Sequence, residues 1–210
     1  YGLSFATNVG VVALSGEISY KKDMPVGVNG TTILTAGLGV LTSQGSLCGT
    51  PFGPLFYGQF GDRACAAFFD FVGNPTERNH VAQGWDRFDV TQVQSTAVYF
   101  WDQGLGSQRV TFIGEAAWVY VDDLPDILEM PYGRNPIFGA PTNILDSTTF
   151  QPVGFSDEGF VTTNSWGYRI RAFAEYPNVF AGVSLTPTLA WSHDVKGTSP
   201  TPTFSEGNKA

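Results

Sequence analysis

The sequence predicts an all-β fold: an antiparallel transmembrane β-barrel, of which this chain forms a segment, with short periplasmic turns and long extracellular loops. Three observations predict it. Only 14% of the 210 residues are charged, while 14% are aromatic; soluble domains carry about 25% charged residues. Six segments alternate between apolar and polar side chains, and the links between them alternate between short and long. No run approaches the ~18 apolar residues of a membrane helix, which leaves the closed barrel as the fold that satisfies backbone hydrogen bonds in lipid.

The first two predicted strands run from Gly2 to Val9 and from Val12 to Met24. Side chains at every second position of a strand point to the same side of the sheet. In the second strand one side is therefore apolar and the other mostly polar. The apolar side comprises Val12, Leu14, Gly16, Ile18 and Tyr20, and the polar side Ala13, Ser15, Glu17, Ser19 and Lys21.

Two further strand pairs follow the same design. The second pair runs from Asp89 to Trp101 and from Arg109 to Val121, with turn-forming residues at 103–107. The third runs from Trp166 to Tyr176 and from Val183 to Trp191. Pro187 weakens the last of these strands, because proline lacks the N–H that a ladder needs.

The second strand of each pair ends in a related way. Tyr20, Tyr120 and Trp191 are each followed three positions later by an aspartate and then by an apolar residue. The recurrence indicates one hairpin design used three times. An aromatic ring suits a lipid–water boundary, and an aspartate beyond it should lie in water. The alternative is a set of ordinary strand ends in a soluble β-sandwich.

The lengths of the links favour the membrane interpretation. Links within a pair are short, whereas the links at 25–88 and 125–165 are long enough to be extracellular loops. Bacterial outer-membrane barrels show this asymmetry, and compact soluble domains seldom contain such loops. Because known barrels begin at about eight strands, we expect residues 1–210 to be part of one larger barrel domain, with further strands supplied outside them. Residues 198–210 have the composition of another outer loop.

Composition and motifs exclude several other functions. The net charge is -8 with only 11 Lys and Arg, which argues against a nucleic-acid partner. His80 and His193 are far apart and C-x-x-C spacing is absent, so no metal is expected. Nucleophile-elbow, zinc-protease and phosphate-loop motifs are also absent. The sequence therefore predicts no enzyme and no cofactor.

Charged side chains fall on the predicted inner side of the strands, where they would line the lumen. An ionisable side chain facing lipid is costly, whereas a wet barrel interior accommodates it. These side chains could contribute to selectivity, or they could form an ion-pair network that makes the wall rigid. The predicted lumen-lining residues are Glu17, Lys21, Glu115, Arg169, Arg171 and Glu175.

The first long loop is unusually rich in apolar residues. Thr32 to Leu41 could form a short helix, and Cys48 and Cys65 could form a disulfide outside the cytoplasm; the alternative is two free thiols. So much apolar surface should be buried. We expect either a site for a hydrophobic solute at the barrel mouth or a self-packed cap without a ligand. The candidate site residues are Phe56, Tyr57, Phe60, Phe68, Phe69 and Phe71.

Three stretches resemble the domain-of-unknown-function family 1302. They begin at Tyr1 (YGLSFATNVG), Leu14 (LSGEISYKKDMP) and Arg171 (RAFAEYPN), and the middle one is the most specific. The resemblance covers most of the strand regions and implies a proteobacterial outer-membrane barrel. It also implies uptake of hydrophobic compounds such as fatty acids, steroids or hydrocarbons, together with periplasmic lipid-binding and inner-membrane transport partners. It supplies no catalytic residues.

Two functions therefore remain open at the level of sequence. The first is an outer-membrane channel or transporter for small hydrophobic compounds, surrounded by membrane lipid. The second is a structural or surface-interaction barrel with a plugged lumen, whose long loops bind another protein or a second copy.

Overall fold

The computed structural model describes residues 1–30, 84–127, 130–134, 144–145, 152–153 and 158–201. Their elements are strands and one 3-10 turn, so the predicted all-β, antiparallel class is confirmed. The chain divides into two compact units: residues 1–22, 89–122 and 163–210 form unit 1, and residues 23–88 and 123–162 form unit 2. The elements are β1 (Gly2–Val9), β2 (Val12–Gly27), β3 (Trp85–Asp102), η2 (Gly104–Gly106), β4 (Arg109–Val121), β5 (Ile144–Leu145), β6 (Pro152–Val153), β7 (Asn164–Phe180), β8 (Val183–Leu185) and β9 (Thr188–Lys196).

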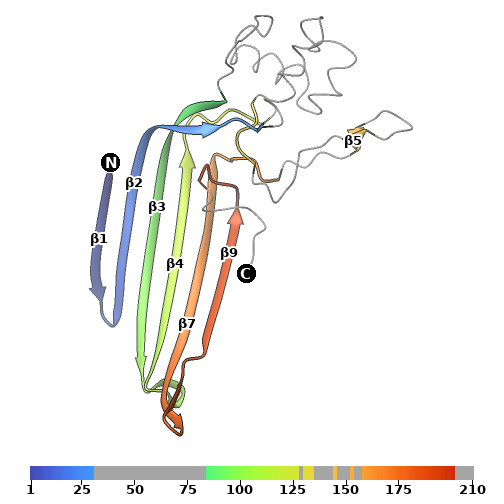
Figure 1. The fold of residues 1–210 in the computed structure, drawn as a ribbon. Helices are drawn as coiled ribbons and strands as arrows, with labels where there is room; N and C mark the ends of the chain where they lie inside the picture. Colours follow the sequence, from blue (N-terminus) through green and yellow to red (C-terminus); the bar gives the residue numbers. More distant parts are fainter. Residues whose placement is uncertain (31–83, 128–129, 135–143, 146–151, 154–157, 202–210) are drawn as a thin grey trace, which may run out of the picture. The chain divides into compact units, whose positions relative to one another are not determined.

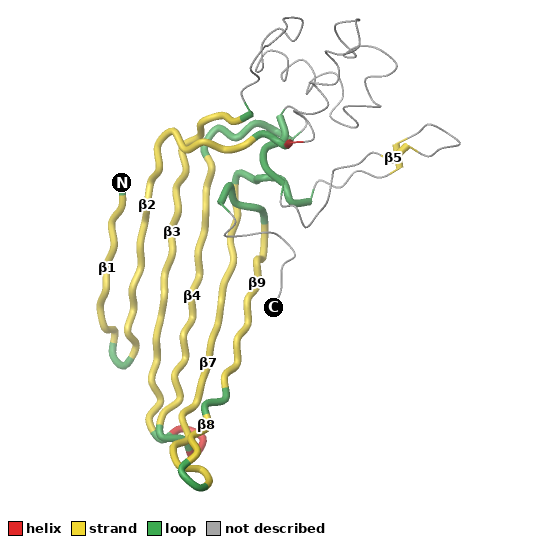
Figure 2. The backbone as a smooth tube through the Cα atoms, in the orientation of Figure 1, coloured by secondary structure: helices red, strands yellow, loops and turns green. Residues whose placement is uncertain are grey.

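Unit 1 is built on a single sheet of long strands. The order of the strands is β1-β2-β3-β4-β7, and β7 then pairs with β9 along most of its length and with β8 at its far end. Figure 1 shows these strands side by side, and Figure 2 shows the tight turns gathered at one end of the sheet. We call this the hairpin end and the opposite one the loop end. In the described part of the chain, β1 and β9 are the edges of the sheet.

The register sorts the side chains of this sheet into two faces, because residues paired across antiparallel strands point to the same side. Trp118 pairs with Trp166, and one residue along β4 Ala117 pairs with Gly167, on the opposite side. The apolar face comprises Leu3, Phe5, Ile18, Tyr20, Val93, Tyr99, Trp101, Phe112, Ala116, Trp118, Tyr120, Trp166, Tyr168, Ile170, Ala172, Leu189, Trp191 and His193. The polar face comprises Ser4, Glu17, Gln92, Gln94, Thr96, Asp102, Arg109, Thr111, Glu115, Ala117, Arg169, Arg171, Glu175 and Ser192.

Glycines make the two tight turns on β1–β2 and β3–β4 possible. Gly10 joins β1 to β2 at a φ of 62°, in the left-handed region that favours glycine. Gly104 is needed for a different reason: a Cβ there would lie 2.5 Å from the ring of Trp101. The indole therefore packs directly on the backbone of the β3–β4 turn, and the Ser107 hydroxyl closes that turn by donating to the Gly104 carbonyl at 2.6 Å.

At the loop end, two of the three recurrent aspartates mark the point where the chain passes from unit 1 to unit 2. Asp23 and Asp123 both have positive φ, 53° and 51°, a conformation that aspartate tolerates better than most residues. Each is the first residue of its unit 2 segment. The third aspartate, Asp194, differs, since it is buried within β9.

The third pair departs most from the expected strands. A register shift between Tyr176 and Phe180 makes the end of β7 irregular. The return strand expected to be continuous from Val183 to Trp191 is instead divided into β8 and β9. Pro187 lies at the division, where its missing N–H would interrupt the ladder.

Unit 2 has a small core of its own. Phe88 meets Tyr132 edge to face with ring centroids 4.8 Å apart, and Val26, Val28 and Phe160 are also buried. The Tyr132 hydroxyl donates to Asp86 at 3.4 Å. Burial first, and then the neighbouring Asp86 carboxylate, raise the pKa of the Tyr132 hydroxyl above its usual range. Parts of both predicted long loops thus pack together.

Substitution of Gly104 by alanine should destabilise the protein, because the new methyl group would overlap the Trp101 ring. Overpacking of this kind typically costs ~1–3 kcal/mol. The measurement is the urea midpoint of the full-length protein refolded into detergent micelles. Gly114→Ala is the matched control, since a Cβ at that strand glycine meets nothing within 4 Å. Equal midpoints for the two variants would contradict the packing described for the turn.

Candidate functional site

The apolar face carries large side chains that nothing in the described part of unit 1 covers. Ile170 is 47% exposed, Trp191 46% and Leu189 71%. Monomeric soluble proteins rarely expose continuous apolar patches of more than a few hundred Å². Large exposed apolar side chains on one face indicate a surface that contacts either lipid or another layer of protein.

Aromatic residues with polar partners form a band across the loop end of the apolar face. The Trp118 indole N–H donates to the Asn164 side-chain oxygen at 3.2 Å, and the Tyr20 hydroxyl donates to the carboxylate of Asp89. Tyr168 contacts His193 edge to face, with ring centroids 5.6 Å apart. The Trp118 and Tyr20 rings each combine an exposed apolar body with a hydrogen-bonded polar tip, a combination that is also typical of aromatic residues at membrane interfaces. The band comprises Tyr20, Trp118, Tyr120, Trp166, Tyr168 and His193.

A second aromatic band crosses the hairpin end of the same face. Tyr99 and Phe112 stack with their ring centroids 6.1 Å apart, and Trp101 lies two residues further along β3, next to the turn. The path from Phe112 to Tyr120 along β4 is about 27 Å at ~3.4 Å per residue. For strands tilted by roughly 35–45°, this path spans about 19–22 Å along a barrel axis, somewhat less than the ~25 Å apolar belt between the aromatic girdles of outer-membrane barrels.

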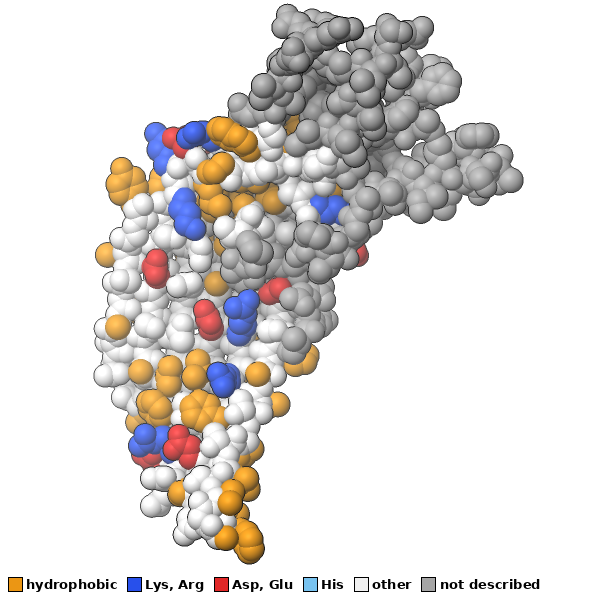
Figure 3. Space-filling view, in the orientation of Figure 1, with side chains coloured by type: hydrophobic (Ala, Val, Ile, Leu, Met, Phe, Trp, Pro, Cys, Tyr) orange, Lys and Arg blue, Asp and Glu red, His pale blue; other side chains and the backbone are white. Residues whose placement is uncertain are grey.

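The polar face brings opposite charges together on neighbouring strands. Glu115 on β4 pairs in register with Arg169 on β7, and Arg171 lies two residues further along β7. Figure 3 shows acidic and basic side chains next to one another over the long strands. Opposite charges directly across an antiparallel pair stabilise it by roughly 0.2–1 kcal/mol relative to alanine.

A second charged group lies at the hairpin end of this face. The Arg109 Nε lies 2.7 Å from the Asp102 carboxylate, and Arg109 also pairs in register with Glu175. Its guanidinium lies 5.3 Å from the centre of the Phe100 ring. Arg109 and Asp102 were not identified from the sequence as lumen-lining candidates. The alternation of side chains nevertheless places both on the same face as Glu115, with Asp102 at the end of β3 and Arg109 at the start of β4.

Of the six predicted lumen-lining residues, the structure brings three together, since Glu115 on β4 lies beside Arg169 and Arg171 on β7. Glu175 lies further along β7, at the hairpin end, where it pairs in register with Arg109. Glu17 lies on β2, opposite Ser4 of β1, and Lys21 shares its side of the strand. Because β3 separates β2 from β4, these two lie apart from the other four. Their role in lining a lumen stays a prediction.

Near the loop end the side chains of the polar face are buried. Val119 and Val121 are buried, and so are Ser165 and Asp194. The ionisable residues therefore lie over the middle and the hairpin end of the face, while its loop end is packed.

The predicted loop site lies outside the described residues. This applies to the six aromatic residues from Phe56 to Phe71, to the short helix from Thr32 to Leu41 and to the disulfide between Cys48 and Cys65. Within the described ranges no three His, Cys, Asp or Glu residues are grouped as metal ligands. No helix in the described part of the chain is both long and apolar enough to cross a membrane.

A charge swap should reveal the pairing of Glu115 with Arg169. Glu115→Arg and Arg169→Glu alone each place like charges opposite one another, and each should lower the free energy of unfolding by about 1 kcal/mol. The double swap should recover most of that loss. Urea unfolding of the four proteins in phospholipid vesicles provides the double-mutant cycle, with Glu115→Gln as the uncharged control. Strictly additive effects would mean that the two side chains do not interact.

Comparison with known proteins gives one match. The family model described as "Protein of unknown function (DUF1302)" matches residues 1–210. The resemblance noted from the sequence motifs is thereby confirmed. No curated protein and no solved structure matches the chain significantly.

Proposed function

We propose that this chain, which belongs to the DUF1302 family, forms part of the wall of a transmembrane β-barrel in a bacterial outer membrane. The observation that carries the proposal is the contrast between the two faces of the unit 1 sheet. Ile170 and Trp191 are exposed on the apolar face, whereas Arg169 and Arg171 occupy the other. In a barrel wall the first face meets hydrocarbon and the second meets the interior.

The pattern on the apolar face favours lipid over a second protein layer. A sandwich core would favour apolar side chains throughout, since its interior excludes water. Here rings with satisfied polar tips, such as Trp118 with Asn164, lie at the loop end, and Tyr99 with Phe112 lies at the hairpin end. Smaller and aliphatic side chains such as Ala116 and Ile170 lie between them. This distribution supports contact with a lipid bilayer, which has an apolar centre and two polar interfaces.

The proposed activity is the passage of small hydrophobic compounds through the interior of the barrel. These compounds are of the fatty acid, steroid or hydrocarbon class. Two features support the solute class: the family resemblance, and the aromatic-rich composition of residues 54–72. The charged polar face would form the rigid wall of the path. Periplasmic and inner-membrane transport proteins are the partners that such a pathway would need.

A structural barrel with a plugged lumen is the second candidate. The observation in its favour is the set of opposite charges that link neighbouring strands, Asp102 with Arg109 and Glu115 with Arg169. Such pairs strengthen a wall whether or not a solute passes. The two candidate functions differ in one respect: blocking the interior lowers solute uptake by a transporter, whereas a plugged barrel has no uptake to lose.

Uptake into vesicles distinguishes them. The full-length protein, reconstituted in vesicles that contain lipopolysaccharide, should accelerate entry of a fluorescent fatty acid over protein-free vesicles. Ala117 lies on the polar face between Gln94 and Gly167, so Ala117→Trp should narrow the interior and lower the rate severalfold. Ala116→Trp places the same bulk on the apolar face and should leave the rate unchanged.

Two results would count against transport. No acceleration by the unmodified protein would favour the structural barrel, as would a stoichiometric partner purified with it in mild detergent. Equal loss of uptake in both tryptophan variants would show that the effect comes from misfolding rather than from a blocked path.

A further inference from the structure

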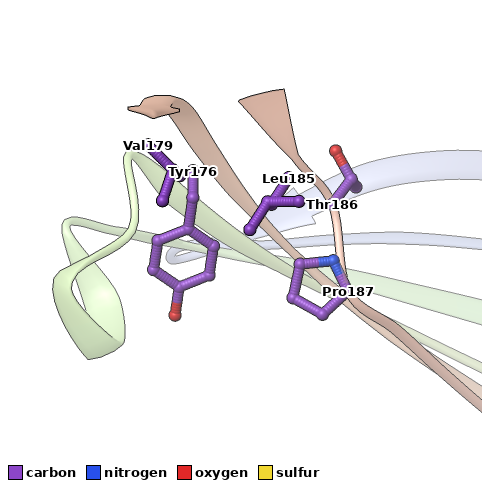
Figure 4. A pocket seen from close by; sticks show the side chains of 5 residues that line it. All are labelled: Tyr176, Val179, Leu185, Thr186 and Pro187. Carbon is purple, nitrogen blue, oxygen red and sulfur yellow. The ribbon is translucent and has the colours of Figure 1, made fainter. Parts of the chain in front are cut away.

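The irregular end of the third hairpin contains an apolar pocket of about 510 Å³. Its lining comes from the end of β7, from β8 and from the residues that join β8 to β9 (Figure 4). The volume lies within the range of about 300–1,000 Å³ typical of small-molecule sites. The lining residues are Tyr176, Val179, Leu185, Thr186 and Pro187.

Three local features create this pocket where a regular hairpin would have none. Between Tyr176 and Phe180 the register shifts, because three residues of β7 face a single residue of β8, and β7 therefore bulges. Positive φ values at Ala181 and Gly182 make a tight two-residue turn between the paired residues Phe180 and Val183, and Asn178, within the irregular part of β7, also has positive φ. Pro187 ends the pairing of β8, since it has no N–H to donate, although its carbonyl still accepts from the Ala174 N–H at 3.1 Å.

The position of the Tyr176 ring is fixed from outside the hairpin. Its hydroxyl donates to the Leu105 carbonyl of the β3–β4 turn at 3.1 Å. The only aromatic hydroxyl of the lining thus already has an acceptor, and the ring turns its apolar surface to the pocket (Figure 4). The site is therefore held by two hairpins rather than by one flexible loop.

The chemistry of the surroundings selects an uncharged ligand. Residues 176–192 include no Asp, Glu, Lys or Arg. The charged groups of this end, Asp102, Arg109 and Glu175, lie on the polar face, where Arg109 forms an ion pair with Asp102. A ligand in the pocket would find apolar contacts and little to hold an ionic group.

The pocket also continues the apolar face of the sheet. Tyr176 follows Ala172 and Ala174 on the same side of β7, and pairs with Leu185. Leu189, opposite Ala172, is 71% exposed on that side. An alkyl chain that lies along the apolar face would therefore reach the pocket while staying in contact with apolar side chains.

We propose that this pocket holds one acyl chain of a membrane phospholipid at the hairpin end of the wall. The inference rests on the proposed function, because it takes the apolar face to be in contact with hydrocarbon. The lipid would cover Leu185 and Val179, which are about half exposed, and would anchor the projecting hairpin at the membrane boundary.

Photo-crosslinking tests the site. The full-length protein is placed in vesicles with a phosphatidylcholine that carries a diazirine in one acyl chain, and the labelled peptides are identified by mass spectrometry. We expect saturable labelling of the lining residues that hexadecane reduces and glycerophosphocholine does not. Leu185→Asp places a charge in the apolar site and should lower this labelling by about tenfold or more.

Controls separate the site from general effects. Ser184→Asp adds the same charge one residue earlier, outside the lining, and should leave the labelling of the lining unchanged. Leu185→Trp fills the pocket without a charge and should reduce labelling even if the aspartate variant folds poorly.

The outcomes distinguish the two proposals. Labelling of Ile170 and Leu189 without saturable labelling of the lining would overturn the pocket inference and leave the barrel proposal intact. Absence of labelling on the whole apolar face would count against both. Competition by glycerophosphocholine would overturn the acyl-chain assignment, since it would mean that the headgroup is bound.

Discussion

The alternation of side chains along paired strands gives one layer an apolar face and a charged, polar face, and the remaining features follow from this. Backbone hydrogen bonding fixes the register in which Trp118 meets Trp166 and Glu115 meets Arg169. A slip by one residue would move every tryptophan to the charged side and every arginine to the apolar side. The register as a whole therefore contributes far more to the stability of the sheet than any single contact within it. The charged pairs add only a small further contribution.

The backbone N–H and C=O groups at the two edges of this sheet also need hydrogen-bond partners. In the described part of the chain, β1 and β9 each have one side without a neighbouring strand. Unpaired backbone groups cost several kcal/mol each in hydrocarbon, so the barrel account requires that further strands pair with both. The tight turns are compatible with close lateral packing at the hairpin end, whereas the chain passes into unit 2, with its small core around Phe88 and Tyr132, at Asp23 and Asp123.

Much of the fold could be predicted from the sequence because alternation is a local signal. The β4 strand begins at Arg109 and ends at Val121 as expected, and the faces of β4 and β7 follow from every second residue. The pocket at Tyr176 could not be predicted, because it depends on a register shift and on a hydrogen bond to Leu105 from another hairpin. The pairing of Arg109 with Asp102 and Glu175 was missed because cross-strand partners depend on strand order, which alternation does not give. The loop aromatics from Phe56 to Phe71 remain a prediction.

Quenching of tryptophan fluorescence by brominated phospholipids tests the contact of the apolar face with hydrocarbon most directly. Within residues 1–210, Trp85→Phe and Trp101→Phe leave Trp118, Trp166 and Trp191, all on the apolar face, and every tryptophan outside these residues is replaced by phenylalanine as well. The account predicts strong quenching, with bromines near the headgroup more effective on Trp118 and Trp166, and bromines deeper in the chain more effective on Trp191. Emission unaffected by bromine at any depth would mean that these rings are enclosed in protein, and the membrane assignment would be wrong.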